Sequence, residues 1–356
     1  MILPALEKRP LVTILSVDGG GIRGLMPVRV LDEIRRRLEA SGSRTPLAGL
    51  FDLVAGTSAG AIVALGITVT NPAGEPRYTP RDILELYERR GTEIFPVSFR
   101  SMLQTAVQAV RFKYAPTGLC RVLSETFGDA TLRDAASYLL ITSFDTEAMQ
   151  PHCMKHLPER CEPSDRSNYR MRDAARASSA APTYFPPARI SPIGDPNRQF
   201  TLVDGAVFAN NPAGLAFVEA TKIFPDESEF VVFSLGTGDP QQGYSYGEIR
   251  RWGYVEWVNP AKGFPIGAIM SAGQSEAVSH QLRRIGGVRY IRINTPLNGC
   301  SPAIDDAGPK NIDCLRRQSD VMISSHDAEI DQICRILVGR SEVTTPKKDN
   351  RSRVFS

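Results

Sequence analysis

The apolar residues of this chain occur in short runs that alternate with segments of helical spacing. Residues 11–17 and 53–55 are nearly uninterrupted apolar runs, which are typical of central strands buried on both faces. Between them, Leu31, Ile34 and Leu38 fall on one face of a helix whose other sides are mostly charged. The order strand, loop, helix, strand, turn, helix predicts a parallel α/β core.

Further elements are predicted beyond this core. Thr79 followed by Pro80 and Asp82 is a capping signal at the start of a helix. Strands are predicted at 138–144, 200–203, 229–235 and 288–293, and helices at 267–284 and 314–338, the last as one or two helices. Residues 151–168 are charged and contain prolines, which predicts an irregular excursion from the fold. Residues 101–114 predict either a helix packed on the core or a lid that touches a membrane with its basic, aromatic end.

Length and composition are those of an ordinary globular protein. The chain has 356 residues, of which 42% are hydrophobic and 23% are charged. This length allows one large α/β domain or two smaller ones, and the lack of a clean linker favours one elaborated domain. The net charge of +3 is too small to indicate DNA or RNA as a partner. No apolar run approaches the roughly 18 residues of a membrane span, and the run at 11–17 is short for a signal peptide. We therefore expect a cytoplasmic protein whose contact with membranes is peripheral.

The cysteines and histidines argue against a disulfide framework and against a metal site. The six cysteines form no CxxC pair and have no even spacing, so we expect reduced cytosolic thiols. His152, Cys153, His156 and Cys161 superficially resemble a zinc site, but structural zinc sites use tighter, paired spacings. We predict that the protein holds no metal.

The sequence GTSAG (residues 56–60) follows the second predicted strand and precedes an apolar segment of helical character. A strand, a G-x-S-x-G turn and a helix form the context of a nucleophile elbow. The flanking glycines let the backbone turn sharply and leave space around the hydroxyl of Ser58. Gly- and Ser-rich turns between a strand and a helix are common, so the motif needs support from the rest of the chain.

The segment DGGGIRG (residues 18–24) follows the first predicted strand and opens a helix. Its unobstructed amides favour negative charge, because the amides and the helix dipole point the same way. Gly19, Gly21 and Gly24 satisfy the dinucleotide pattern G-x-G-x-x-G, but that pattern needs an acidic residue about 20 positions on, at the end of the second strand. The acidic residues nearest that distance lie in the predicted helix, which disfavours a dinucleotide site.

The alternative function of this loop is an oxyanion hole. If the two turns lie on adjacent parallel strands, the loop and the Ser58 hydroxyl meet at one edge of the sheet. A carbonyl attacked by Ser58 would then develop its negative charge against the amides around Gly20 and Gly21. Arg23 has two interpretations, which stay open: it orients a phosphate or steadies the loop, or it forms an ordinary salt bridge.

A nucleophilic serine needs a base. Asp204 ends a predicted strand and is followed by Gly205, which lets another group approach closely. A carboxylate bonded directly to the serine would make a Ser–Asp dyad. His280 would instead give the order Ser, Asp, His of an α/β-hydrolase triad. It lies in a polar helical segment without a loop signal, and we interpret it as a surface histidine.

Together the motifs resemble those of a known family. The blocks DGGGIRG (18–24), GTSAG (56–60), ARASSAAPTYF (175–185), DGA (204–206) and SLGTG (234–238) are similar to the patatin-like phospholipase family, in the family's order. The resemblance implies a three-layer α/β/α core with a mostly parallel central sheet, plus a C-terminal extension. It also implies a catalytic dyad of Ser58 and Asp204, an oxyanion hole at Gly19, Gly20 and Gly21, and hydrolysis of lipid acyl esters without a metal or other cofactor.

The resemblance also sets our expectations for the domains. We expect a catalytic domain over residues 10–240 and a C-terminal elaboration packed on it over 241–340. A disordered tail is expected over 341–356.

A second hypothesis concerns regulation. Compact bacterial proteins of this kind resemble the effectors of anti-phage defence, which a cyclic di- or trinucleotide activates to degrade membrane phospholipid. Bases stack on aromatic rings and phosphates pair with arginines, and such residues gather after position 240: Arg250, Arg251, Trp252, Tyr254 and Trp257. The same residues could form a hydrophobic cap over the lipid site, and the alternative function is a constitutive lipase or esterase without nucleotide control. The chain is also compatible with a homo-oligomer.

Overall fold

A single mixed sheet forms the centre of the molecule. The computed structural model describes residues 11–96, 112–161, 168–226, 229–240, 243–259 and 264–344. Within them an eight-stranded sheet has the strand order β5-β6-β3-β2-β1-β7-β8, and β4 pairs with β3 beside this path. The strands are β1 (Val12–Val17), β2 (Leu53–Thr57), β3 (Tyr138–Asp145), β4 (Gln150–His156), β5 (Ala188–Ile190), β6 (Phe200–Asp204), β7 (Phe230–Leu235) and β8 (Val288–Ile293).

The parallel part of the sheet positions the site. β3, β2, β1, β7 and β8 are parallel neighbours, so their carboxyl ends meet at one edge. The strands β4 and β6 run antiparallel to β3, and β5 runs antiparallel to β6. The prediction of a mostly parallel central sheet is confirmed.

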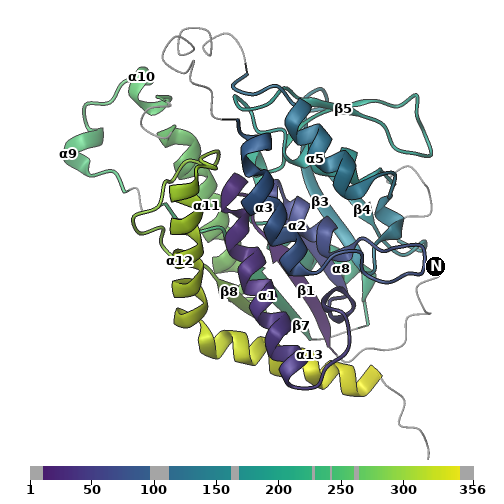
Figure 1. Cartoon of the computed structure of the whole chain (residues 1–356). Coiled ribbons are helices and arrows are strands. Elements are labelled where there is room, and N and C mark those ends of the chain that lie inside the picture. Colours follow the sequence, from purple (N-terminus) through teal and green to yellow (C-terminus); the bar gives the residue numbers. More distant parts are fainter. Residues whose placement is uncertain are drawn as a thin grey trace, which may run out of the picture.

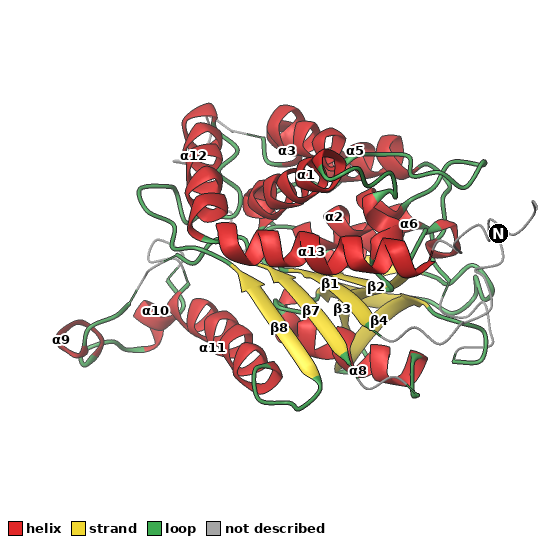
Figure 2. Cartoon of the chain, turned by 90° about the horizontal axis from the view of Figure 1, so that it is seen from below, coloured by secondary structure: helices red, strands yellow, loops and turns green. Residues whose placement is uncertain are grey.

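Helices cover both faces of the sheet (Figure 1). They are α1 (Leu25–Ala40), α2 (Ala59–Thr68), α3 (Pro80–Ile94), α5 (Thr117–Phe127), α6 (Met171–Ser178), α7 (Ala206–Ala209), α8 (Ala213–Ile223), α9 (Tyr246–Ile249), α10 (Tyr254–Trp257), α11 (Pro265–Leu282), α12 (Pro309–Ser325) and α13 (Asp327–Thr344). Figure 2 shows α1, α2, α3, α5, α6, α12 and α13 on one face, and α8 and α11 on the other. The three-layer α/β/α prediction is therefore confirmed.

The central strand β1 shows why its sequence is apolar throughout. Leu15 and Val17 pack into the core beneath α1 and α2, while Val12 and Ile14 pack into the core on the α8 face. A strand covered by helices on both faces has no solvent-facing positions. Its sequence therefore lacks the alternation of apolar and polar residues that marks a strand with one exposed face.

Most local predictions are confirmed, and one is wrong. The side chains of Thr79 and Asp82 form the capping box at the start of α3. β8 spans the predicted residues 288–293, and the predicted helical segment after residue 313 belongs to two helices, α12 and α13. The irregular excursion predicted over 151–168 is wrong for its first six residues, which belong to β4; among the described strands, β4 pairs with β3 alone. A strand with one partner tolerates proline and charged side chains that a central strand excludes. The predicted helix at 101–114 lies almost entirely outside the described residues.

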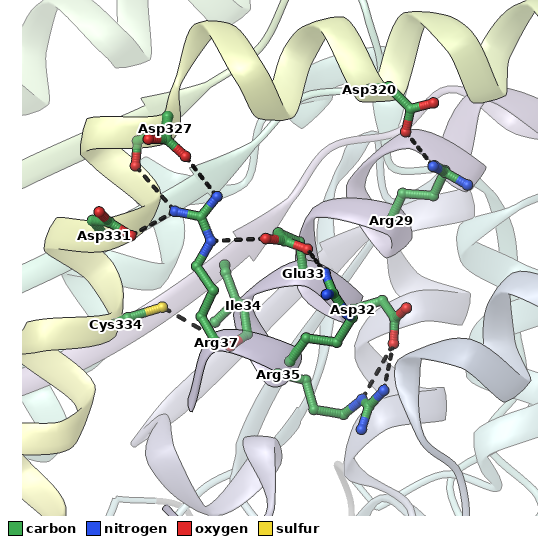
Figure 3. A network of polar contacts seen from close by, with 11 residues as sticks. Arg29, Asp32, Glu33, Ile34, Arg35, Arg37, Asp320, Asp327, Asp331 and Cys334 are labelled. Atoms are coloured by element: carbon green, nitrogen blue, oxygen red, sulfur yellow. Dashed lines mark hydrogen bonds and ion pairs between the residues drawn. The ribbon is translucent and has the colours of Figure 1, made fainter. Parts of the chain in front are cut away.

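The residues after 240 belong to the same fold as the rest of the chain. β8 extends the sheet beside β7, and α12 and α13 pack against α1. Figure 3 shows the polar contacts of this packing: Arg37 of α1 bonds Asp327 and Asp331 of α13, and Arg29 of α1 pairs with Asp320 of α12. Helix α13 continues to the end of the described residues, and most of the predicted tail lies beyond them.

The expectation of reduced cysteines is wrong at two positions. Cys300 and Cys314 form a disulfide, with their Cα atoms 5.5 Å apart. The spacing of the cysteines could not show this pairing, because it depends on how the loop that contains Cys300 folds back onto α12, which contains Cys314. Among the helices of the described residues, none combines the length and the apolarity needed to cross a bilayer.

Candidate active site

Ser58 lies between the end of β2 and the start of α2, where the elbow motif places it. Its backbone angles are φ 55° and ψ −122°, a conformation that costs a residue with a side chain about 1–3 kcal/mol. A Cβ on Gly60 would lie 2.2 Å from the carbonyl oxygen of Val17, so only glycine lets α2 approach β1 this closely. The turn therefore places Ser58 at the carboxyl edge of the parallel strands.

Strand β3 brings Ser58 and Asp204 together. Thr57 at the end of β2 pairs with Thr142 on one side of β3, and Asp204 at the end of β6 pairs with Ser143 on the other side. Ser58 Oγ donates a hydrogen bond of 2.6 Å to Asp204 Oδ2. Both residues are buried, with 8% of Ser58 and 2% of Asp204 exposed.

The environment of Asp204 suits a group that exchanges a proton near neutral pH. Its second oxygen, Oδ1, accepts a hydrogen bond of 2.8 Å from the Ala206 amide. Burial raises the pKa of Asp204 to about 7, although the hydrogen bonds from Ser58 and Ala206 oppose the shift. A base with a pKa near the working pH is well matched to general acid–base catalysis.

The end of α6 supports both members of this pair. Ser178 Oγ accepts a hydrogen bond of 2.8 Å from the Ser58 amide. The carbonyl of Ala180, just after the helix, accepts a hydrogen bond of 3.0 Å from the Asp204 amide. The small residues of this segment allow the backbone to pass directly against both turns.

The glycine loop at 18–24 offers fewer free amides than the sequence implies. The Gly19 N–H donates to the Asn210 carbonyl at 3.1 Å, so it is not free to bind an oxyanion. In the described part of the chain, the N–H groups of Gly20 and Gly21 have no acceptor. Of the three glycines predicted as oxyanion donors, Gly20 and Gly21 are the two whose N–H groups stay free within the described residues.

Two glycines of this loop are required for different reasons. Gly21 has φ 58°, and a Cβ on it would lie 2.1 Å from the carbonyl oxygen of Ile304. A Cβ on Gly19 would lie 3.3 Å from Ser58 Cβ and 2.6 Å from the Asn210 side chain. A side chain at either position would displace the loop from the serine.

Arg23 binds the loops of the site through their backbone. Its Nε donates to the Gly20 carbonyl at 3.3 Å, and its Nη1 donates to the Gly238 carbonyl at 3.4 Å. Burial lowers the pKa of Arg23 to about 10, and the nearby Asp239 opposes this shift. These contacts support the interpretation in which Arg23 steadies the loop.

An apolar pocket opens beside Ser58. It lies between the glycine loop, the helices α2, α3 and α5, and the segment after α6. Its apolar walls include Ile22, Ile62, Ile94, Leu119, Phe185 and Ile304. Such a lining suits a hydrocarbon chain better than a charged or hydrated group.

None of the four histidines, all of which the structure describes, bonds to the Ser58–Asp204 pair. His280 is exposed on α11 and contacts Arg284, as the surface interpretation predicts. His152 bonds the Tyr169 hydroxyl, and burial lowers its pKa to about 4. Within the described residues, no cluster of three or more His, Cys, Asp or Glu side chains is arranged to hold a metal ion.

Comparison with known proteins agrees with this geometry. The family model described as patatin-like phospholipase matches residues 15–217, which is more than half of the chain and includes both Ser58 and Asp204. The chain belongs to the patatin-like phospholipase family. As a member, it is a lipid acyl hydrolase, which is a class of carboxylic ester hydrolase.

Plant relatives align over most of this patatin-like chain. Patatin-like protein 2 of Arabidopsis thaliana is 31% identical over 90% of the chain and 84% of its own length. Patatin-like protein 1 of Oryza sativa subsp. indica is 32% identical over 88% and 81%, and patatin-T5 of Solanum tuberosum is 29% identical over 86% and 82%.

Sequence reasoning missed residues that reach the site from the far end of the chain. Arg292 of β8 bonds Asp18, and the Ile304 carbonyl accepts a hydrogen bond from the Ile22 amide. No local signal marks either residue. The one signal that could have found them is the parallel sheet itself: β8, as a parallel neighbour of β7, ends at the same edge of the sheet as the glycine loop.

Proposed function

We propose that this patatin-like protein hydrolyses the fatty acyl esters of membrane phospholipids through a dyad of Ser58 and Asp204. The observation that carries the proposal is the 2.6 Å hydrogen bond between Ser58 Oγ and the buried Asp204 carboxylate. A serine whose hydroxyl points at a base with a raised pKa is prepared for nucleophilic attack.

The reaction follows from this geometry in two steps. Asp204 takes the Ser58 proton as Oγ attacks the ester carbonyl, and the oxyanion forms against the amides of Gly20 and Gly21. The tetrahedral intermediate collapses, and the protonated Asp204 passes its proton to the leaving lysolipid alkoxide. Water then attacks the acyl-enzyme with Asp204 again as base, which releases the fatty acid and restores Ser58.

The lining of the pocket supports an acyl chain as the recognised group. Its walls beside Ser58 are apolar, and they come from elements on the same face of the sheet. Each buried methylene of a bound chain stabilises the complex by about 0.8 kcal/mol. We therefore place the acyl chain in this pocket and the head group outside it.

A lipid substrate requires contact with a membrane surface, and one face of the molecule suits it. Large apolar side chains are exposed on α9 and α10 and on or just before α11. These side chains are here called the α9–α11 face: Tyr246, Tyr254, Val255, Phe264, Ile266, Ile269 and Met270. Figure 1 shows α9 and α10 projecting from the body of the molecule. Gln274 of α11 bonds the backbone of Asn211, close after Asp204, so this face adjoins the catalytic edge. Tyrosines beside Arg250 and Arg251 are typical of a surface that lies against lipid head groups.

The dyad is tested by substituting its members. Ser58→Ala and Asp204→Asn should each lower kcat on phospholipid and on a soluble ester by at least about 10³-fold, because each removes a member of the covalent machinery. His280→Ala is the matched control and should keep the native rate. Circular dichroism should show that all variants are folded. If His280→Ala is inactive and Asp204→Asn is active, the dyad assignment is wrong.

Activation by a cyclic di- or trinucleotide and a role in anti-phage defence stay predictions. In the structure the Trp252 ring packs edge-on against Tyr244 and Trp257. Hydrolysis measured with and without a panel of cyclic nucleotides distinguishes the regulated enzyme from a constitutive one. Full activity without any nucleotide would contradict the switch.

A further inference from the structure

The first residue of the glycine loop is held by a residue from near the other end of the chain. Arg292 of β8 bonds both carboxylate oxygens of Asp18, with Nη1 to Oδ1 at 2.9 Å and Nη2 to Oδ2 at 2.6 Å. The same Nη1 donates to Ser234 Oγ at 2.8 Å. The side chains are 12% and 3% exposed for Arg292 and Asp18. A bidentate pair of this kind fixes the orientation of the carboxylate as well as its position.

The other end of the loop is held by a second segment from the same region. The Ile22 amide donates to the Ile304 carbonyl at 2.8 Å. Ile304 lies within the segment that the disulfide between Cys300 and Cys314 closes. The next residue, Asp305, is buried and accepts a hydrogen bond of 2.8 Å from the Tyr114 hydroxyl. The carbonyl is therefore presented by a loop that is itself restrained.

These contacts lie on either side of the free amides. Asp18 and Ile22 flank Gly20 and Gly21, whose N–H groups have no acceptor within the described residues. Glycine residues lose more conformational freedom on ordering than any others, so a loop of three glycines does not hold its amides in place by itself. An oxyanion hole requires donors that are aimed before the reaction begins.

We propose that Arg292 is a positioning residue for catalysis: with the Ile304 carbonyl, it clamps the glycine loop and sets the Gly20 and Gly21 amides for the oxyanion. The clamp comes from residues after 217, beyond the part that the family model matches. This inference rests on the proposed oxyanion role of the loop. It gives the C-terminal region a function in the chemical step itself.

The rival explanation is that Arg292 only stabilises the fold. Breaking a buried ion pair leaves an uncompensated charge and destabilises a protein whatever the pair does in catalysis. The two explanations differ in the rate of molecules that remain folded. They also differ when both charges are removed together. The stability should then recover under either explanation, but if Arg292 positions the loop, the Gly20 and Gly21 amides stay misplaced and the rate stays low.

The test compares Arg292→Gln with Arg37→Gln. Arg37 also joins α1 to the C-terminal region, through Asp327 and Asp331 (Figure 3), but it lies in the last turn of α1, whereas the glycine loop precedes the first turn. On a soluble short-chain ester, at a temperature where both variants are folded, Arg292→Gln should lower kcat about 10- to 100-fold with KM within about twofold. Arg37→Gln should keep the native kcat even where its Tm falls. Equal kcat in the two variants would overturn the proposal.

A double variant keeps the test decisive if Arg292→Gln does not fold. Asp18→Asn with Arg292→Gln removes both buried charges, so its Tm should recover relative to Arg292→Gln while kcat stays at least about tenfold low. Recovery of kcat together with Tm would overturn the clamp. Ser58→Ala separates this result from the proposed function: if Ser58→Ala is active, the dyad fails, whereas an inactive Ser58→Ala beside a fully active Arg292→Gln refutes the clamp alone.

Discussion

At the scale of single residues, Ser58 and Asp204 are each held in a state that folding alone does not favour. Ser58 has a positive φ, and Asp204 is a buried carboxyl whose partners are a hydroxyl and an amide. Burial raises the pKa of Asp204 to about 7. The folded chain therefore binds this proton more tightly than the unfolded chain, and stability is lost as the pH rises toward 7. Strain and unfavourable burial of this kind collect at functional sites because the chemistry requires them.

The pH dependence of the rate should report the ionisation of Asp204. The base acts only when it is ionised, so kcat/KM should fall about tenfold per pH unit below about pH 7 and level off above it. The profile is measured on a soluble ester, so that membrane binding does not enter. A rate that stays level down to about pH 5 would contradict Asp204 as a base with a raised pKa.

Asp204→Asn provides the matching measurement of stability. The carboxamide does not ionise, so this variant should have a higher Tm than the native chain at about pH 8. The difference should shrink as the pH falls toward about 4, where the folded carboxyl is protonated and the unfolded one, with its ordinary pKa of 3.8, is also taking up its proton. A constant difference in Tm across this range would mean that folding does not shift the pKa of the Asp204 carboxyl.

At the scale of elements, the helices on one face of the sheet enclose the apolar pocket beside Ser58. Ile62 of α2, Ile94 of α3 and Leu119 of α5 all belong to the same apolar core and also line the pocket. The pocket is thus a part of the core that the glycine loop and Ser58 leave open at one end. Its shape depends on how these helices pack, and a change of one side chain changes the space for the substrate.

Enlarging Leu119 should change the chain-length preference of the enzyme. In Leu119→Phe, kcat/KM for long-chain esters should fall about tenfold relative to short-chain esters, because the ring takes space that the acyl chain occupies. Leu123→Phe is the matched control, since Leu123 is equally buried on α5 but does not line the pocket. Competition between esters of different lengths measures the ratio. The same ratio in both variants would argue that the chain binds elsewhere.

At the scale of the whole molecule, the C-terminal region contacts the glycine loop and also carries the exposed face that we propose for membrane contact. Through β8 and the loop after it, this region reaches the glycine loop, and α12 and α13 bind α1. Through α9, α10 and α11 it presents the exposed α9–α11 face next to the residues that follow Asp204. The proposed membrane contact and the active site are therefore joined by one continuous part of the chain.

Charges placed on the α9–α11 face should separate membrane binding from chemistry. Val255 and Met270 are 70% and 64% exposed, so Val255→Glu with Met270→Glu should fold normally. The double variant should bind phospholipid vesicles at least about 100-fold more weakly and hydrolyse them more slowly, because each of the two apolar side chains contributes about 1.5–3 kcal/mol when buried in the membrane. Its rate on a soluble ester should be native.

Val218→Glu is the control for this experiment, since Val218 is 62% exposed on α8, outside the α9–α11 face. It should bind vesicles as the native chain does. Native vesicle binding by the double variant would move the membrane contact to another surface.

The parallel core, the elbow and the family follow from patterns that can be read along the chain, whereas the completion of the site depends on how distant segments pack. The apolar runs at 11–17 and 53–55 are visible in the sequence itself, and Gly56 acts locally, because a Cβ on it would lie 2.3 Å from the carbonyl oxygen of Gly60 in the same turn. The capping box of α3 is local in the same way. The positions of Ser58 and Asp204 at the ends of predicted strands suggested that they meet. Their contact, however, depends on the pairing of β2 with one side of β3 and of β6 with the other.

The rest could not be seen in the sequence, because it depends on contacts between residues far apart in the chain. The Gly19 amide looks free until Asn210 is placed beside it, and a lone Arg292 on a strand carries no sign of its partner Asp18. The disulfide between Cys300 and Cys314 likewise appears only when the loop folds back. Local patterns determine which elements form; the packing of those elements decides which amides stay free, which charges pair and hence which groups are available for chemistry.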